Sequence, residues 1–123
     1  MTLADWKSPR TRPHIASNDD NWIHDVTRLA LSTPSERLRI ESLTLLRGVG
    51  WPMASVILHF CHTDPYPILD FRALWALGAE EPEYDFSFWQ TYTRTCRNLA
   101  ARAACDMRTL DRALWAYSKA NQR

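Results

Sequence analysis

Asp70 and two glycines, Gly48 and Gly50, are the residues whose types and spacing best suit chemistry in this chain. Residues 46–58 read LRGVGWPMASVIL, and Asp70 follows Gly50 by 20 positions, in the run YPILDFRALW. An aspartate that begins a helix is among the best N-caps, because its carboxylate accepts hydrogen bonds from the unpaired amides of the first turn. The same carboxylate could act in a reaction or face DNA. The two roles are compatible, and the sequence leaves both open.

The glycine pair predicts a tight hairpin between two helices. Gly48 and Gly50 flank the small apolar Val49, so the backbone can turn sharply and leave successive amides uncovered where the next helix begins. Such amides, with the dipole of the helix behind them, bind a phosphate without regard to sequence. The hairpin therefore predicts contact with a phosphate backbone.

The segment LRGVGWPMASVIL resembles the helix-hairpin-helix element, whose pattern is Leu-x-Gly-Val-Gly-x-x-x-Ala followed by aliphatic residues. Its continuation resembles the helix-hairpin-helix DNA glycosylase superfamily, in which an aspartate follows the second glycine at this distance and heads the next helix. The chain is similar to a short, divergent bacterial member. The resemblance covers about residues 34–78, and its matched positions are Leu46, Gly48, Val49, Gly50, Ala54 and Asp70.

The resemblance implies a role for Asp70 and a possible ion. In that superfamily the aspartate stabilises the cationic sugar that forms as the glycosidic bond breaks, or it activates the attacking nucleophile. The resemblance also implies a monovalent cation on the hairpin carbonyls, and we expect no other cofactor. By resemblance, Asp70 is the candidate catalytic residue, and the partner is DNA, held through its backbone without sequence preference.

The departures from the superfamily narrow the expected chemistry. Members that also cut the strand carry a Schiff-base lysine two residues after the second glycine, where this chain has Pro52. The only lysines are Lys7 and Lys119, so an enzyme here would be a monofunctional N-glycosylase without lyase activity. The four-cysteine cluster motif of several members is also absent. Those enzymes build the base pocket between two helical domains, whereas only 45 residues precede Leu46 here.

Two other candidate residues, Arg72 and Trp51, each have a structural and a functional interpretation. Arg72 suits a structural ion pair or a phosphate, and Trp51 suits an exposed base or burial against the preceding helix. Most of the aromatic residues on amphipathic helices are expected in the core; these residues are Trp75, Trp89, Tyr92, Trp115 and Tyr117. The candidate DNA-binding residues are Arg47, Gly48, Val49, Gly50, Trp51 and Arg72.

Cysteine and histidine spacing argues against a metal site or a disulfide framework. His59, Cys61 and His62 lie close together, but on a helix Cys61 faces away from the two histidines. We therefore expect no metal. Cys61, Cys96 and Cys105 are an odd count without a C-x-x-C pair, which favours buried, reduced thiols.

Charge is segregated along the chain, although the net charge is only +1. Residues 64–85 carry one Lys or Arg against six Asp or Glu, whereas residues 86–123 carry seven against two. A basic carboxyl-terminal region attracts phosphates, but it is equally consistent with a solvated helix face. Residues 1–17, with the sequence KSPRTRPH at their centre, predict a loose basic arm.

Hydrophobic periodicity predicts an all-α fold of about six helices, with no strand, in one compact domain over residues 1–123. Thr33, Pro34 and Glu36 predict a capping box before the second helix. The segments LDFRALWAL and LDRALWAY share most of their letters, which we attribute to convergence on one type of helix start. The expected helices are 20–31, 34–46, 52–61, one from Asp70 or Phe71 to Gly78, one from Phe86 to about Ala100, and one after Asp106.

The sequence predicts a protein without a membrane segment, and we expect it in the cytoplasm. Two functions from different classes remain open. In the first, the chain is a DNA-binding domain of glycosylase descent, with or without base excision. In the second, the hairpin is only a structural turn, and the helices bind another protein or a second copy of the chain.

Overall fold

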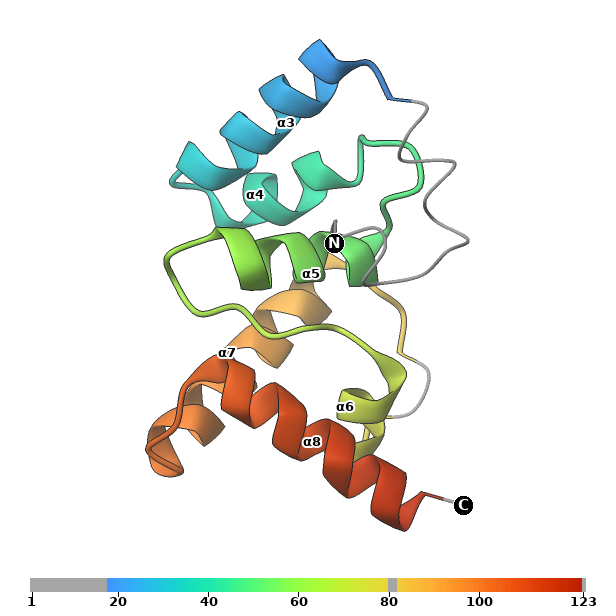
Figure 1. The fold of residues 1–123 in the computed structure, drawn as a ribbon, viewed down its shortest axis with the longest axis vertical. Coiled ribbons are helices and arrows are strands. Elements are labelled where there is room, and N and C mark those ends of the chain that lie inside the picture. Colours follow the sequence, from blue (N-terminus) through green and yellow to red (C-terminus); the bar gives the residue numbers. More distant parts are fainter. Residues whose placement is uncertain (1–17, 80–81, 123) are drawn as a thin grey trace. The chain divides into compact units, whose positions relative to one another are not determined.

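The computed structural model describes residues 18–79 and 82–122, and the basic arm predicted for residues 1–17 lies outside them. The described residues form six α-helices and no strand, so the all-α prediction is confirmed (Figure 1). Contacts between residues group the chain into two units, one ending at His62 and the other beginning at Thr63. The helices are α3 (Asp20–Ser32), α4 (Glu36–Leu43), α5 (Trp51–Cys61), α6 (Phe71–Ala76), α7 (Phe86–Arg102) and α8 (Met107–Asn121).

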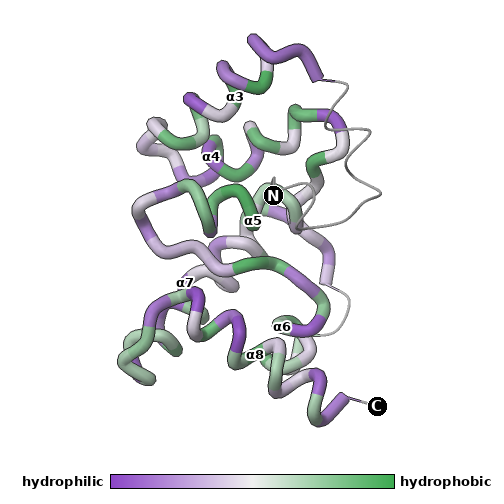
Figure 2. Tube along the Cα trace, in the orientation of Figure 1, coloured by the Kyte–Doolittle hydropathy of each residue, from purple (hydrophilic) through white to green (hydrophobic). Residues whose placement is uncertain are grey.

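The first unit holds α3, α4 and α5, with α4 packed against both of the others. Asp19 caps α3 by accepting a hydrogen bond from the amide of Asn21 at 2.9 Å. Helix α5 is apolar along most of its length (Figure 2), and its only exposed residues are the last two, Phe60 and Cys61, as expected for a helix without a wide polar face. The buried apolar side chains of this unit are Val26, Ala30, Ile40, Leu43, Leu46, Val49, Met53, Ala54, Val56 and Leu58.

The predicted capping box at Thr33 is wrong. Ser35 is the N-cap of α4, and its hydroxyl accepts the amide of Leu38 at 3.1 Å. Thr33 instead ends α3 as its C-cap and accepts the Ser35 amide at 3.1 Å. The carboxylate of Glu36 binds the guanidinium of Arg39. Because the connection between α3 and α4 is so short, Thr33 is used to end α3. The N-cap of α4 therefore lies two positions later than predicted, at Ser35.

A buried arginine, which the sequence analysis did not single out, holds this connection together. Arg39 is 6% exposed, and its Nε donates to the carbonyl of Ala30 at 3.0 Å, while Nη2 donates to the carbonyl of Thr33. Both carbonyls lie at the carboxyl end of α3, where the last turn leaves carbonyls without helical partners. A cation there also offsets the negative end of the helix dipole.

Helix α4 ends earlier than predicted, at Leu43. The amides of Thr44, Leu45 and Leu46 bond to carbonyls three residues back, at 3.0 to 3.2 Å. Such bonds tighten the chain into a narrower turn, which is common where a helix ends. The α-helical geometry is therefore lost before the first glycine of the hairpin.

The second unit holds α6, α7 and α8, with α8 packed against both of the others. Helix α7 holds the extended segment before Asp70 in place, because the Tyr92 hydroxyl donates to the carbonyl of Ile68 at 2.6 Å and Arg97 Nε donates to that of Pro65 at 2.8 Å. The rings of Tyr66 and Trp89 stack with their centroids 6.2 Å apart. The prolines predict this extended segment, whereas its partners come from a helix later in the chain.

The similar segments LDFRALWAL and LDRALWAY do not occupy equivalent positions in their helices. Asp70 caps α6, whereas Asp111 lies inside α8, whose cap is Asp106. The prediction that both segments are helix starts is therefore wrong for the second segment. The two segments instead meet, because α6 packs on α8 and the rings of Trp75 and Tyr117 lie 6.0 Å apart.

Candidate functional site

The hairpin lies in the first unit, between α4 and α5, and it contains both exposed and buried residues. Gly48 adopts φ of +82°, a left-handed conformation that favours glycine. The amide of Val49 bonds to the carbonyl of Leu46 at 3.1 Å, and both side chains are buried. Gly48 and Gly50 remain exposed. Val49 thus anchors the turn in the core while the glycine backbone faces outward.

The N-terminus of α5 differs from those of the other five helices. Gly50 is its N-cap and supplies no side-chain hydrogen bond, and Pro52 in the first turn has no amide hydrogen. The amides of Gly50, Trp51 and Met53 donate to no acceptor in the described part of the chain. The other five helices are capped by Asp19, Ser35, Asp70, Asp85 and Asp106.

Arg47, at the start of the hairpin, is held by a residue that sequence reasoning missed. The Asn18 side chain accepts the Arg47 amide at 2.9 Å and donates to the Arg47 carbonyl at 3.1 Å. The Arg47 side chain is exposed. No local signal pairs these residues, because 29 positions separate them.

The other residues beside the hairpin have mixed environments. Trp51 is half-buried, so its ring is neither a core side chain nor a fully exposed platform. Among the hairpin carbonyls, those of Leu46 and Gly50 accept amide hydrogens, whereas those of Gly48 and Val49 accept none from the described residues. Two carbonyls with both lone pairs available fit part of the oxygen shell of a monovalent cation, and that ion stays an expectation of the resemblance.

Asp70 lies in the second unit and caps α6, as predicted. Its Oδ1 accepts the amide of Ala73 at 2.8 Å, and the helix begins at Phe71. The carboxylate is half-buried, and its second oxygen accepts no hydrogen bond from a described residue. One oxygen is therefore structural, whereas no residue of the described ranges donates to the other.

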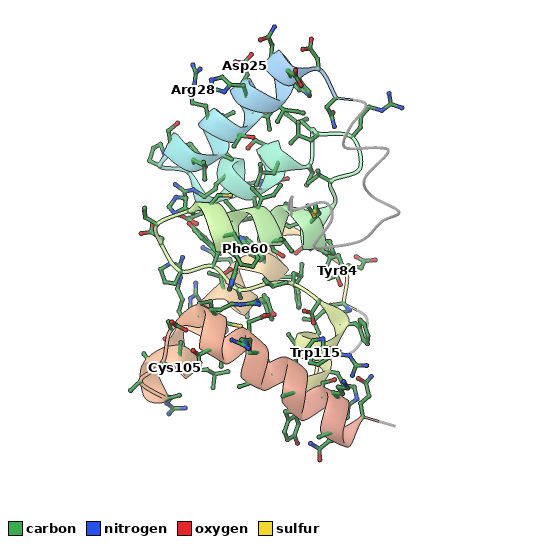
Figure 3. All side chains as sticks on the ribbon, viewed as in Figure 1. Asp25, Arg28, Phe60, Tyr84, Cys105 and Trp115 are labelled. Carbon is green, nitrogen blue, oxygen red and sulfur yellow. The ribbon has the colours of Figure 1, made fainter. Side chains whose placement is uncertain are left out.

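A pocket of about 760 Å³ lies within the second unit, and Phe71, the residue after Asp70, is part of its wall. Three aromatic residues contribute to its wall, and burial, followed by the negative charge of Asp70, raises the pKa of the Tyr84 phenol. The carboxylate therefore acts electrostatically on Tyr84, a residue of this wall that Figure 3 labels. The lining residues are Phe71, Leu74, Trp75, Ala79, Pro82, Tyr84 and Gln122.

Arg72 forms no ion pair within the described residues, so the structural ion pair considered for it is not observed. Its guanidinium carbon lies 5.3 Å from the ring centroid of Phe71 and 5.2 Å from that of Trp115. Trp115 is 43% exposed, Tyr117 is 54% exposed and Trp75 is half-buried, so the expectation that most of the five helix aromatics lie in the core is wrong. Of the five, Trp89 and Tyr92 are buried. The hairpin belongs to the first unit, and Asp70 and Arg72 belong to the second.

The remaining sequence candidates contribute little to a site. The ring of His59 packs edge-on against Phe60, with centroids 4.8 Å apart, and no group of three His, Cys, Asp or Glu side chains gathers for a metal in the described ranges. Of the three cysteines, only Cys96 is buried, which corrects the expectation for Cys61 and Cys105. None of the described helices combines the length and apolarity needed to span a bilayer.

No protein family, curated protein or solved structure gives a significant match to the chain.

Proposed function

We propose that the chain binds DNA without sequence preference, through phosphate contacts at the hairpin between α4 and α5. The observation that carries this proposal is the open N-terminus of α5. Its first amides, at Gly50, Trp51 and Met53, have no side-chain cap and no acceptor among the described residues. Unpaired amides at the positive end of a helix dipole favour an anion.

The hairpin suits a phosphate better than a base edge. Backbone amides present the same donors to every nucleotide, so they position a strand without reading it. The exposed Arg47 adds a positive charge at the same turn, and Asn18 orients its peptide. Affinity should then fall steeply as salt rises, because each phosphate contact releases counterions.

We further propose that Asp70 supports monofunctional base excision. Support comes from the second carboxylate oxygen of this half-buried residue, which accepts no hydrogen bond from a described residue, and from the aromatic pocket whose wall includes the adjacent Phe71. A carboxylate can stabilise the positive charge that develops on a sugar as its bond to a base breaks. Because Pro52 occupies the Schiff-base position, no strand cleavage through a lysine adduct is proposed.

The substitution Gly50→Asp separates DNA binding from folding. Gly50 has φ of −93° and ψ of −171°, which any residue adopts, and an added Cβ would lie 3.8 Å from Pro52 Cδ, an ordinary contact. An aspartate there would supply the missing cap and occupy the anion site with its own carboxylate. We expect unchanged or increased stability to urea, and about tenfold or greater loss of affinity for a labelled duplex at low salt.

Two matched variants complete this test. Gly50→Ser caps the same amides without a negative charge, so it should weaken binding less than the aspartate does. Arg28→Gln removes an exposed arginine of α3 in the same unit and should leave binding near that of the parent. If Gly50→Asp is folded and binds the duplex like the parent, the hairpin is not the contact and the proposal fails.

A groove of about 420 Å³ in the first unit supports a second candidate function, self-association. Leu38 and Leu45, which line it, are 44% and 58% exposed, and exposed apolar clusters often mark protein interfaces. Sedimentation velocity tests this candidate, since Leu45→Lys should dissociate a dimer. A parent that sediments as a monomer at all concentrations would exclude it. The groove is lined by Leu29, Ser35, Arg37, Leu38, Glu41, Ser42 and Leu45.

A further inference from the structure

We propose that α8 and the start of α6 form a second nucleic-acid site, which binds an unpaired strand by stacking its bases on exposed rings and pairing its phosphates with interleaved cations. We call this surface the α8 stripe. It consists of Arg108, Arg112, Trp115 and Lys119 on α8 with Phe71 and Arg72 on α6.

The helix period places the four α8 residues on one face. Arg108, Arg112, Trp115 and Lys119 follow one another at steps of four, three and four residues, the spacing at which helical side chains are neighbours. The buried residues of α8 occupy an adjoining face that packs into the unit. The stripe is therefore one continuous strip of helix surface. The core-facing residues are Met107, Leu110 and Ser118.

Cations and rings of the stripe contact one another in the order Phe71, Arg72, Trp115 and Lys119. Lys119 Nζ lies 5.1 Å from the Trp115 ring centroid, and the Arg72 guanidinium lies between Trp115 and Phe71 at cation–π distance from both. Phe71 remains 65% exposed and Trp115, which Figure 3 labels, remains 43% exposed, so these contacts leave ring surface open. Both rings thus offer stacking area beside a positive charge.

This chemistry matches an unpaired strand more closely than a duplex or a protein. Bases of a single strand expose their faces and stack on aromatic side chains without regard to sequence, whereas a duplex hides those faces and presents phosphates alone. Arg112 and Lys119 are exposed and form no ion pair with a described residue, so they can meet phosphates. Residues 86–123 carry seven basic against two acidic residues, which complements a polyanion.

The α8 stripe is independent of the hairpin. It lies wholly in the second unit, whereas the hairpin lies in the first, so either proposal can fail without the other. The hairpin amides predict binding to any phosphate backbone. The stripe predicts an additional preference for unpaired bases.

Fluorescence anisotropy with the full chain and labelled oligo(dT), oligo(U) and duplex probes tests the stripe. We expect Trp115→Ala to weaken oligo(dT) binding by roughly five- to a hundredfold, the range for the loss of one stacked base, and to change duplex binding little. Trp115→Phe should keep most of the affinity. Trp22→Ala is the matched control, because Trp22 is 44% exposed in the other unit. If the chain binds oligo(U) as tightly as oligo(dT), the stripe accepts RNA and DNA single strands equally, through the same stacking and charge contacts.

A charge pair keeps the test decisive if Trp115→Ala fails to fold. The double variant Arg112→Gln, Lys119→Gln leaves the rings in place and should reduce both the affinity for oligo(dT) and its dependence on salt. Arg94→Gln removes an exposed charge of α7 outside the stripe and should do neither.

Three results would overturn the proposal. The folded Trp115→Ala variant could bind oligo(dT) like the parent, or the double charge variant could do so. Alternatively, unlabelled polyglutamate could displace labelled oligo(dT) as well as unlabelled oligo(dT) does. The last result would identify a general site for acidic chains. Oligo(dT) binding that survives Gly50→Asp but not Trp115→Ala would establish the stripe apart from the hairpin.

Discussion

Asn18 holds the peptide of Arg47 from both sides, accepting its amide hydrogen at 2.9 Å and donating to its carbonyl at 3.1 Å. One side-chain amide thereby ties the chain before α3 to the first residue of the hairpin. The hairpin is therefore fixed by a contact across the unit in addition to its own glycines. Its geometry should respond to a change at a distant position.

Replacing Asn18 with alanine should destabilise the first unit and weaken DNA binding together. Both hydrogen bonds are lost, which lowers the free energy of unfolding by about 1–2 kcal/mol in urea titrations. Asn18→Asp keeps the acceptor but loses the donor, so its effect should be intermediate. Asn21→Ala serves as the control, because Asn21 uses its backbone amide in the α3 cap. Equal unfolding midpoints for Asn18→Ala and the parent would contradict this prediction.

The same substitution at the two hairpin glycines should have opposite effects on stability. Gly48 has φ of +82°, so Gly48→Ser forces a side chain into the left-handed region and should cost about 1–2 kcal/mol. Gly50→Ser supplies a cap at an allowed conformation and should stabilise by a few tenths, about 0.3 kcal/mol. Urea unfolding followed by circular dichroism measures both. Equal destabilisation by the two variants would mean that the turn tolerates no side chain at either position.

Asp70 can be tested by a pair of variants that separate its cap from its charge. Asp70→Asn keeps an acceptor for the Ala73 amide and should cost little stability, whereas Asp70→Ala should cost about 0.5–2 kcal/mol. If the carboxylate acts in base excision, Asp70→Asn should abolish base release from damaged DNA while unfolding like the parent. Undiminished base release by Asp70→Asn would exclude a catalytic carboxylate.

Borohydride trapping on an abasic duplex should yield no covalent adduct through the hairpin. Pro52 has no amine at the position where a lysine would form the Schiff base. Denaturing electrophoresis detects an adduct, and a glycosylase with lyase activity provides the positive control. An adduct that disappears on mutation of Lys7 or Lys119 would contradict the expectation.

Cys96 should resist thiol reagents and should make the fold sensitive to high pH. Burial raises the pKa of its thiol to about 12 from an ordinary value of 9.0, although a hydrogen bond with Tyr92 lowers it in part. Because the folded pKa is the higher one, this stabilisation is complete below about pH 9 and is lost as pH rises toward 12. Ellman's reagent at pH 8 should modify Cys61 and Cys105 first, and Cys96 only on unfolding. Three equally fast thiols would contradict the assignment.

Local sequence signals predicted the helices and the hairpin well. Apolar spacing identified the six helices of the described residues, and Asp70 was expected to cap α6 because the prolines before it force an abrupt helix start. These predictions succeed because a helix, its cap and its terminating glycine depend on residues within a few positions of one another. The capping box at Thr33 fails for the same local reason, since two nearby hydroxyls compete for one helix start and the sequence cannot rank them.

The sequence by itself determined the all-α class, the Gly48 turn and the cap at Asp70, whereas the tertiary structure decided what surrounds them. Only packing places Asn18 on Arg47, buries Arg39 under the end of α3, and sets Arg72 between Phe71 and Trp115 in place of an acid. These partners lie in other elements or across a turn, and their choice depends on how helices cross. Side-chain type limits the possible partners, but only the path of the chain in space selects one.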